Sequence, residues 1–449
     1  MTLALLSALG APVANAQDYT DFGFVLTAPE ASAFESGIGA PTVLYDDDTS
    51  TWHMYFESQV EHSQAEACAC LELDEGDTAG CLEYTDVWAI GHATSTDGVS
   101  WTVDEAPVFE PEAGTFYGCS VAQPAVLKDS DGTWHLFFTS KAEPLTADPD
   151  TGDAFETALQ VQYLENGFGW ATSTDGVSWT VQGDEPLVYN TIEDDGDNWR
   201  AASFPTATKV GERLYVVFVK VPSMFVGISG DDGQSWDWYE DVLVPGSAYW
   251  IQDRIFGPSV TCEEDTSENA LTMFFGGKQC NDSNCNDAQL AYGEATSPQG
   301  LDWYVSSNSP IYEVDDKHPQ FTHFDVVKAG DETLLFYSRT DDETGKEAVG
   351  LFATTDSYGE PESRHCRTGE ADADTDTDTD ADTDTDTDTD ADTDTDTDAD
   401  ADADTGSENG NTRCGGCGGG CGCATGGPDP AGLLAFFGLG MLLVQRRRR

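Results

Sequence analysis

The sequence is poor in basic side chains. Only 19 of its 449 residues are Lys or Arg, against 84 Asp or Glu, so the formal net charge is −65. Proteins bind nucleic acid largely through Lys and Arg that neutralise phosphates, and a surface this acidic repels nucleic acid and anionic membranes. We therefore expect no nucleic-acid partner. The body before residue 370 is itself strongly acidic, which indicates a surface adapted to salt, with retention of divalent cations as the alternative.

The sequence also lacks an apolar run long enough to cross a bilayer as a helix, which takes about 20 residues. The stretch Ala431–Val444 is shorter and is followed by the basic cluster Arg446–Arg449. Four cysteines precede it among glycines: Cys414, Cys417, Cys421 and Cys423. We interpret residues 414–449 as a sorting signal rather than a permanent anchor. A zinc knot is the alternative, disfavoured because Gly-only spacers do not hold a ligand geometry.

Two further segments lie outside any folded body. Residues 1–16 are apolar and end in Ala14-Asn15-Ala16, which is typical of a signal peptide cleaved before Gln17. From Glu370 the chain alternates Asp with Ala or Thr, so it has nothing to bury, and its like charges extend it. The sequence therefore predicts an exported protein with a disordered acidic stalk over 370–413.

The body, residues 17–369, is built from repeats. IGHATSTDGVSWT at 90–102 recurs as FGWATSTDGVSWT at 168–180, with looser copies at 226–238, 292–304 and 349–361. Each copy follows a second recurring segment, which consists of an apolar run, a turn and a run of alternating aromatics. These segments occupy residues 40–58, 123–141, 204–222, 257–277 and 324–340. Repetition at this period is the mark of stacked or radial architectures.

Each pair of segments encodes two hairpins. Trp134, Leu136 and Phe138 alternate with His135 and Phe137, the period of a strand, and Asp-Gly dipeptides supply the turns. Five such units predict an all-β fold, a five-bladed β-propeller; a β-sandwich would not explain the repetition. Asp97, Asp175 and Asp231 belong to Asp-box turns and are predicted to be structural.

The Pro-led segments followed by ATSTDGVSW at 93–101 and 171–179 resemble the propeller superfamily of glycoside hydrolase families 32, 43, 62 and 68. The resemblance covers roughly residues 21–360 and implies a sugar ligand. The C-terminal order of Cys motif, short apolar segment and Arg cluster resembles the myxobacterial sorting signal. That resemblance implies processing near the cysteines and display at the cell surface or outer membrane, with membrane contact through this segment only.

The resemblance also implies catalytic carboxylates directly before the Pro of the inner strands. The residues at those positions here are Ala40, Gln123, Phe204 and Gly257, and none is acidic. Glu35, Asp253 and Asp325 lie near the strand starts and form a candidate replacement set of acid, base and modulator. The alternatives are a solvated loop tip for Glu35, an ion pair with Arg254 for Asp253, and a strand-start hydrogen bond for Asp325.

Substrate-binding candidates gather before the inner strands. Aromatic side chains offer flat faces to sugar rings, Gln123 lies at a strand start, and two Arg stand out in an acidic chain as ligands for an anionic sugar. The candidates are Phe34, Tyr117, Gln123, Trp199, Arg200, Trp250 and Arg254. The alternatives are that the aromatics plug the funnel and that the two Arg form ordinary salt bridges.

Eight cysteines lie in the exported body, an even number that favours disulfides. They are Cys68, Cys70, Cys81, Cys119, Cys262, Cys280, Cys285 and Cys366. Zinc is the minor alternative, and the Asp and Asn around Cys280–Asp287 make calcium another; no cofactor is otherwise predicted. The sequence thus indicates a monomeric propeller head that binds carbohydrate and hydrolyses it if the acid set is complete. The alternatives are a non-catalytic adhesion module and a purely structural surface head.

Overall fold

The structure, a computed structural model, describes residues 20–61, 87–142, 167–189, 191–192, 199–200, 202–262, 271–280, 288–314, 320–321, 323–329, 332–354 and 365–366. The described residues form β-strands, turns and loops without a helix, and so include no helix that could span a membrane. The predicted stalk and sorting segment, and the predicted signal peptide, lie outside these residues.

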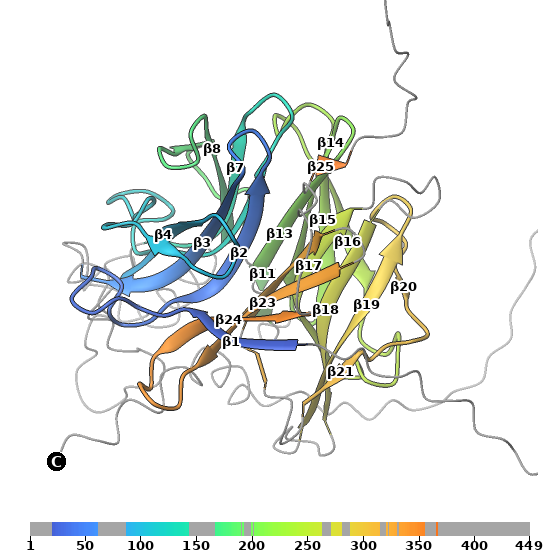
Figure 1. The fold of residues 1–449 in the computed structure, drawn as a ribbon. Helices are drawn as coiled ribbons and strands as arrows, with labels where there is room; N and C mark the ends of the chain where they lie inside the picture. The colour runs from blue at the N-terminus through green and yellow to red at the C-terminus, as the bar shows by residue number, and fades with distance from the viewer. Residues whose placement is uncertain are drawn as a thin grey trace, which may run out of the picture. The chain divides into compact units, whose positions relative to one another are not determined.

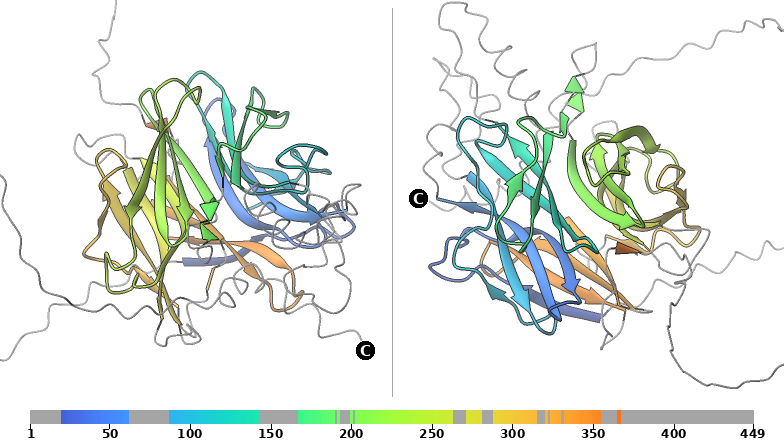
Figure 2. Two further views of the ribbon diagram at one scale, coloured as in Figure 1. Left: turned by 180° about the vertical axis from the view of Figure 1, so that it is seen from behind. Right: turned by 90° about the horizontal axis from the view of Figure 1, so that it is seen from above.

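The strands form the five blades of a β-propeller (Figures 1 and 2). Blade 1 contains β2 (Gly39–Asp46), β3 (Thr51–Val60), β4 (Val87–Ser95) and the short β5 (Thr102–Val103). Blade 2 contains β6 (Ser120–Lys128), β7 (Trp134–Lys141), β8 (Gly167–Ser173), β9 (Thr180–Val181) and β10 (Val188–Tyr189). Blade 3 contains β13 (Ala202–Val210), β14 (Arg213–Lys220), β15 (Ser223–Ser229) and β16 (Asp237–Leu243).

Blade 4 contains β17 (Arg254–Cys262), β18 (Leu271–Cys280), β19 (Ala288–Ser297), β20 (Tyr304–Val305) and β21 (Tyr312–Glu313). Blade 5 contains β22 (His323–Ala329), β23 (Glu332–Thr340) and β24 (Glu347–Ala353), and its outer strand is the N-terminal β1 (Thr20–Leu26). Two short elements complete the order: β11 (Thr191–Ile192) pairs with β12 (Trp199–Arg200), and β25 (His365–Cys366) pairs with β13.

The blades pack face to face through the alternating side chains of their middle strands. In β7, Leu136 and Phe138 pack with blade 1 residues such as Tyr55, whereas Phe137 points the other way and packs with blade 3. All are fully buried, and burying each such side chain contributes about 1.5–3 kcal/mol. The strand is apolar on both sides because both of its faces meet another blade.

The inner strands share one irregularity at their starts. Ala40, Gln123, Phe204 and Gly257, each directly before a Pro, have φ between 43° and 54°, and the ladder register shifts at each of them. A bulge with left-handed φ costs energy for a residue with a side chain, so the surrounding contacts must maintain it. Blade 5 has no Pro at this position and no shift in register.

A chain of hydrogen bonds ties the inner strands together. Thr206 Oγ1 accepts from Val260 N–H at 3.1 Å, and Ser259 Oγ accepts from Val326 N–H at 2.9 Å. Asp325 then accepts from a backbone N–H of blade 1. In each case the side chain of one blade binds the backbone of the next, which fixes the order and spacing of blades 3, 4, 5 and 1.

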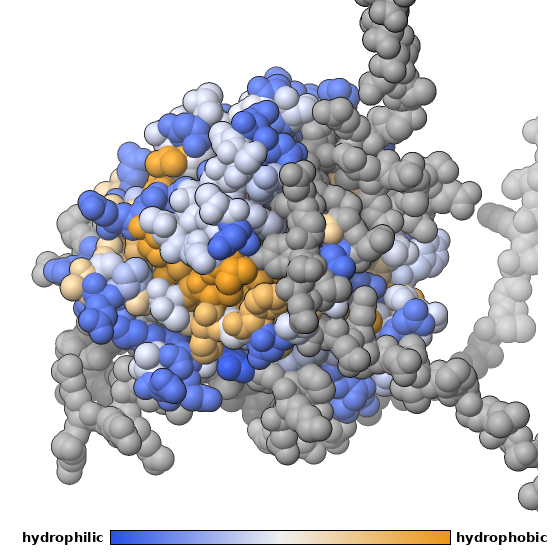
Figure 3. All heavy atoms as spheres, viewed as in Figure 1, coloured by the Kyte–Doolittle hydropathy of each residue, from blue (hydrophilic) through white to orange (hydrophobic). Residues whose placement is uncertain are grey.

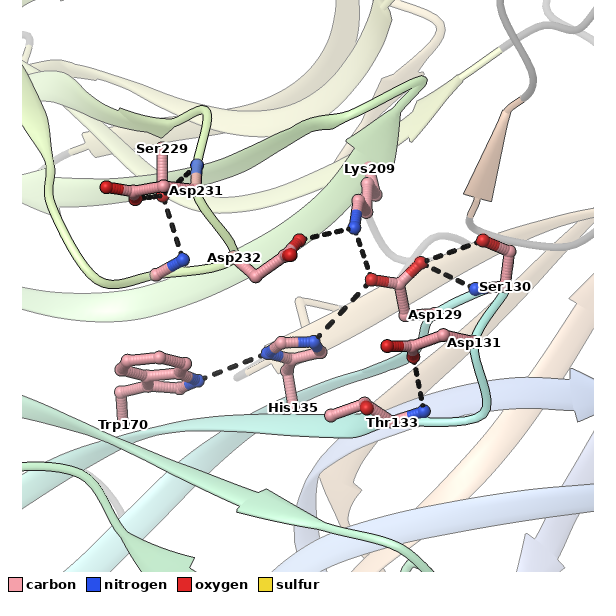
Figure 4. Close-up of polar contacts among 11 residues, drawn as sticks. Asp129, Ser130, Asp131, Thr133, His135, Trp170, Lys209, Ser229, Asp231 and Asp232 are labelled. Carbon is pink, nitrogen blue, oxygen red and sulfur yellow. Dashed lines mark hydrogen bonds and ion pairs between the residues drawn. The ribbon is translucent and has the colours of Figure 1, made fainter.

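Ion pairs join neighbouring blades at the end where the inner strands finish, called the far end below. Lys209 of blade 3 binds Asp129 of blade 2 and, at 2.8 Å, Asp232 of its own blade (Figure 4). Lys128 of blade 2 occupies the equivalent position and binds Asp46 of blade 1 at 2.5 Å. Ion pairs therefore hold neighbouring blades together at the far end, whereas the bulges of the inner strands lie at the opposite end.

The Asp-box turns have the predicted structural form. Asp97 Oδ1 accepts from the backbone N–H groups of Val99 and Ser100, and Trp101 Nε1 donates to Gly98 O at 3.1 Å. These backbone donors lower the pKa of Asp97 to about 2. The boxes lie at the far end, in the turns that follow the third strand of a blade, and their carboxylates are occupied by the turn itself.

Candidate functional site at the axial mouth

The starts of the inner strands surround one end of the propeller axis, called the axial mouth below. A cavity of about 30 Å³ opens there, which is room for about two water molecules and far too little for a sugar ring. The residues around it are Ala40, Gln123, Phe204, Gly257, His323 and Asp325, with the adjoining prolines. A ligand at this end must therefore lie over the mouth rather than enter the axis.

Gln123 forms hydrogen bonds with residues of several blades around the mouth. Its backbone N–H donates to Glu57 Oε2 at 2.9 Å, and its side-chain Oε1 accepts from Phe204 N–H at 3.0 Å and from Thr139 Oγ1 at 2.8 Å. These two donors identify the amide oxygen, so Nε2 is the donor that faces His323 Nε2 at 3.4 Å. The side chain of Gln123 thus joins blades 2, 3 and 5.

This contact assigns the tautomer of His323. Since Gln123 Nε2 donates, His323 Nε2 accepts and the imidazole proton is on Nδ1. That Nδ1 is buried and has no hydrogen-bond partner in the part of the chain that the structure describes. Burial lowers the pKa of His323 to about 4, and the ring centroid lies 5.0 Å from that of Phe204. At neutral pH the mouth therefore contains a neutral imidazole whose buried N–H has no partner among the described residues.

A pair of carboxyl groups lies beside the mouth. Glu57 is on β3 opposite Gly39, with only 6% of its surface exposed. A Cβ on Gly39 would stand 2.5 Å from Glu347 Oε2, so the Glu347 carboxyl occupies the space above this glycine. Burial raises the pKa of Glu57 to about 8, and the charge of Glu347 adds to the rise. Glu57 is therefore protonated near pH 7, which makes it a candidate proton donor.

The carboxylates predicted from the sequence lie in three different environments. Glu35 is exposed on a turn before β2. Asp253 is exposed directly before β17, where its N–H donates to Lys278 O. Asp325 is buried within β22, where both of its carboxylate oxygens accept hydrogen bonds. The structure does not test their catalytic role, which stays a prediction.

Most of the predicted sugar-binding aromatics are in the core. Phe34, Tyr117 and Trp250 are buried, so their rings are packed against protein rather than open to a ligand. The exposed aromatic at this end of blade 4 is Tyr249, the neighbour of Trp250, with 63% of its surface accessible. Of the remaining candidates, Gln123 lies in the mouth, Arg254 is half-buried at the start of β17, and only the backbone of Trp199 and Arg200 in β12 is described.

Sequence reasoning missed Glu57, Glu347 and His323. Glu57 follows the apolar run Met54-Tyr55-Phe56 in a strand that is buried on both faces. A single carboxylate at such a position is the signal that could have identified it, because an unpaired charge is rarely buried.

The cysteines and the metal alternatives are described only in part. Cys119 and Cys262 are disulfide-bonded. Cys68, Cys70, Cys81 and Cys285 lie outside the described residues, as do the four sorting cysteines 414, 417, 421 and 423. For Cys280 and Cys366 only the backbone is described. The described residues contain no group of three or more His, Cys, Asp or Glu that could hold a metal, and most of the calcium candidate around 280–287 lies outside them.

The fold is similar to solved glycoside hydrolases. A glycosyl hydrolase from Bacteroides ovatus is 14% identical, with a TM-score of 0.48, over 78% of this chain and 95% of that one. The catalytic domain of the Coprinopsis cinerea GH62 α-L-arabinofuranosidase is 10% identical, with a TM-score of 0.47, over 75% and 97%. Zg3597, a family 117 glycoside hydrolase of Zobellia galactanivorans, is 14% identical, with a TM-score of 0.46, over 75% and 89%.

No protein-family model matches the sequence, and no curated protein matches it. Likenesses at this identity concern the fold alone, which is a five-bladed β-propeller.

Proposed function

We propose that this protein is an exported, surface-displayed propeller head that binds carbohydrate over the axial mouth and hydrolyses a glycosidic bond there. The observation that carries the proposal is Glu57, a carboxyl group held beside the mouth on the N–H of Gln123 and protonated near neutral pH. Glycoside hydrolysis needs such an acid to protonate the departing oxygen, together with an ionised carboxylate. In this proposal Glu57 is the acid and Glu347 the carboxylate.

Binding is supported by an exposed aromatic ring at the mouth end of blade 4. Tyr249 has 63% of its surface accessible, and the C–H faces of sugar rings stack on such a ring. Export and display are supported by the predicted signal peptide, the acidic stalk and the C-terminal segment.

The test is release of reducing sugar from a panel of plant, algal and bacterial polysaccharides by the chain purified from Gln17, in high salt. We expect release that disappears in Glu57→Gln and persists in Glu35→Gln, which changes an exposed carboxylate. Release that depends instead on Glu35, Asp253 or Asp325 would move the reaction to the set predicted from the sequence. No release by the folded protein would reject hydrolysis.

A non-catalytic glycan-binding head is the second candidate. It is favoured by the small cavity, which leaves the mouth as a shallow surface, and by the exposed ring of Tyr249. Binding of an oligosaccharide without turnover would support it.

A further inference from the structure

The C-terminal end of the body returns to the far end of the propeller. The two residues of β25 pair in parallel with the last two residues of β13, with His365 opposite Lys209 and Cys366 opposite Val210. Lys209 is also the lysine of the far-end ion pairs. Figure 1 shows β25 near the top of the view, where it pairs with the end of β13.

Cys262 lies at the same place in the next blade. It is the last residue of β17, the inner strand beside β13, and its Sγ is 3.8 Å from Lys209 O. The residue is buried, with 3% of its surface exposed, and it is disulfide-bonded. The dipeptide Lys209-Val210 is thus in contact with Cys262 and also paired with the backbone of β25. Cysteines can be joined when their Cα atoms lie within about 7 Å, and Cys262 and the backbone of Cys366 both lie against this dipeptide.

We propose that Cys366 is the disulfide partner of Cys262, so that the C-terminal end of the body is held covalently at the far end of the propeller. The two thiols give up two protons and two electrons to the disulfide of a thiol–disulfide exchange protein, which is reduced as the new S–S bond forms. This disulfide does not depend on the proposed function.

The acidic repeats predicted to form a stalk give this disulfide a mechanical use. They begin at Glu370, four residues after Cys366, and their like charges are expected to extend them. A covalent bond at the root transfers any pull on the stalk to β17 and β13, two inner strands of the propeller. Without it, the same pull would act on a two-residue strand.

Peptide mapping of the unreduced, alkylated full-length protein tests the pairing directly. Trypsin is expected to yield Ile255–Lys278, whose only cysteine is Cys262, and His365–Arg367, whose only cysteine is Cys366. We expect these two peptides to appear as one disulfide-linked species that disappears on reduction. Alkylated Cys366, or Cys262 linked to any other peptide, would overturn the proposal.

A cleavable variant gives an independent readout without any sugar. A site for a sequence-specific protease is inserted between Pro361 and Glu362 of the full chain, and the cut protein is run on a denaturing gel. We expect head and stalk to stay joined until reductant is added. In Cys366→Ser they should separate without reductant, whereas Ser363→Ala should behave as the parent; separation of the parent without reductant would overturn the proposal. Failure here leaves sugar release untouched, so the two hypotheses fail separately.

Discussion

Asp325 Oδ2 accepts a hydrogen bond of 2.7 Å from the backbone N–H of Val43, which precedes it by 282 residues. The other oxygen, Oδ1, accepts from Ser259 Oγ at 2.8 Å. One carboxylate therefore links blade 5 to blade 1, the first and last parts of the propeller, and to blade 4 as well. Its two hydrogen bonds connect strands of different blades that no turn joins. This side chain therefore helps to close the ring of blades between blade 5 and blade 1.

Replacing Asp325 should therefore unfold the propeller more readily. Asp325→Ala leaves the buried N–H of Val43 and the hydroxyl of Ser259 without this acceptor, so we expect a loss of about 3 kcal/mol in the free energy of unfolding. Asp325→Asn keeps one acceptor and should lose less. Urea denaturation measures both, with exposed Glu35→Gln as a control within about 0.5 kcal/mol. Unchanged stability in Asp325→Ala would contradict the closure role.

The two sets of far-end ion pairs should contribute differently to the free energy of unfolding. Lys209 and Asp129 have 6% and 3% of their side chains exposed, so Lys209→Met leaves a buried carboxylate without its cation and should cost about 3–5 kcal/mol. Lys128 has 17% of its side chain exposed, although its partner Asp46 is buried at 6%. Because water reaches this pair more easily, Lys128→Met should cost less, about 1–3 kcal/mol. Chemical denaturation distinguishes the two, and equal losses would show that burial is not what matters here.

Stability should depend on pH through Glu57. Its pKa is raised from 4.5 to about 8 by burial, so the folded state binds the extra proton between these values. The associated stability is present below pH 4.5 and is lost as the pH rises through 8. Glu57→Gln should be more stable than the parent at pH 8, by up to about 4 kcal/mol, and similar to it near pH 4.5. Denaturant midpoints across this range measure the effect; parallel curves would contradict a buried acid at this position.

We expect that a glycine is required at position 39 because any larger side chain would clash with the carboxyl group of Glu347. The Cβ of Gly39→Ala would lie 2.5 Å from Glu347 Oε2, so the carboxyl must move away from the mouth. A double-mutant cycle with Glu347→Ala should give a coupling energy of about 1–3 kcal/mol, because each change relieves or creates the same clash. Gly230→Ala is the control, since nothing lies within 4 Å of the added Cβ. Additive losses would place the Glu347 carboxyl elsewhere.

Two equally exposed tyrosines test where carbohydrate binds. Tyr249 and Tyr304 are both 63% exposed, but Tyr249 lies at the mouth end of blade 4 and Tyr304 at its far end. Loss of a stacking ring costs about 0.5–1.5 kcal/mol, so Tyr249→Ala should weaken oligosaccharide binding about 3- to 10-fold. Tyr304→Ala should leave it unchanged. Titration calorimetry measures both, and an equal effect of the two changes would argue against binding at the mouth.

The blades could be predicted from the sequence because their signal is local. The segment at 123–141 contains a turn between two runs of alternating side chains, and the structure has β6 and β7 there. The role of β1 could not be predicted, because its place depends on pairing with β24, far along the chain. Likewise, aromatics were expected before the inner strands, but which ring is exposed depends on packing: Trp250 is buried and its neighbour Tyr249 is not.

The site was harder to predict than the fold. None of the residues directly before the inner prolines is acidic, and the carboxyl groups beside the mouth, Glu57 and Glu347, come instead from β3 and β24. Their approach depends on the bulge at Ala40 and on the missing side chain of Gly39, neither of which has a sequence signal of its own. A register shift of one residue would have turned Glu57 to the other face.

The pairing of β1 with β24 also sets the order in which the molecule can be made. The first strand of the body to be synthesised is an outer strand of the last blade, and its partner ends at Ala353. The segment Thr20–Leu26 therefore cannot pair with β24 until nearly the whole body has emerged from the ribosome. Contacts this distant in sequence form slowly, so a nascent chain truncated before Glu347 should remain an open arc of blades with an exposed edge, and a holding chaperone would act on that edge.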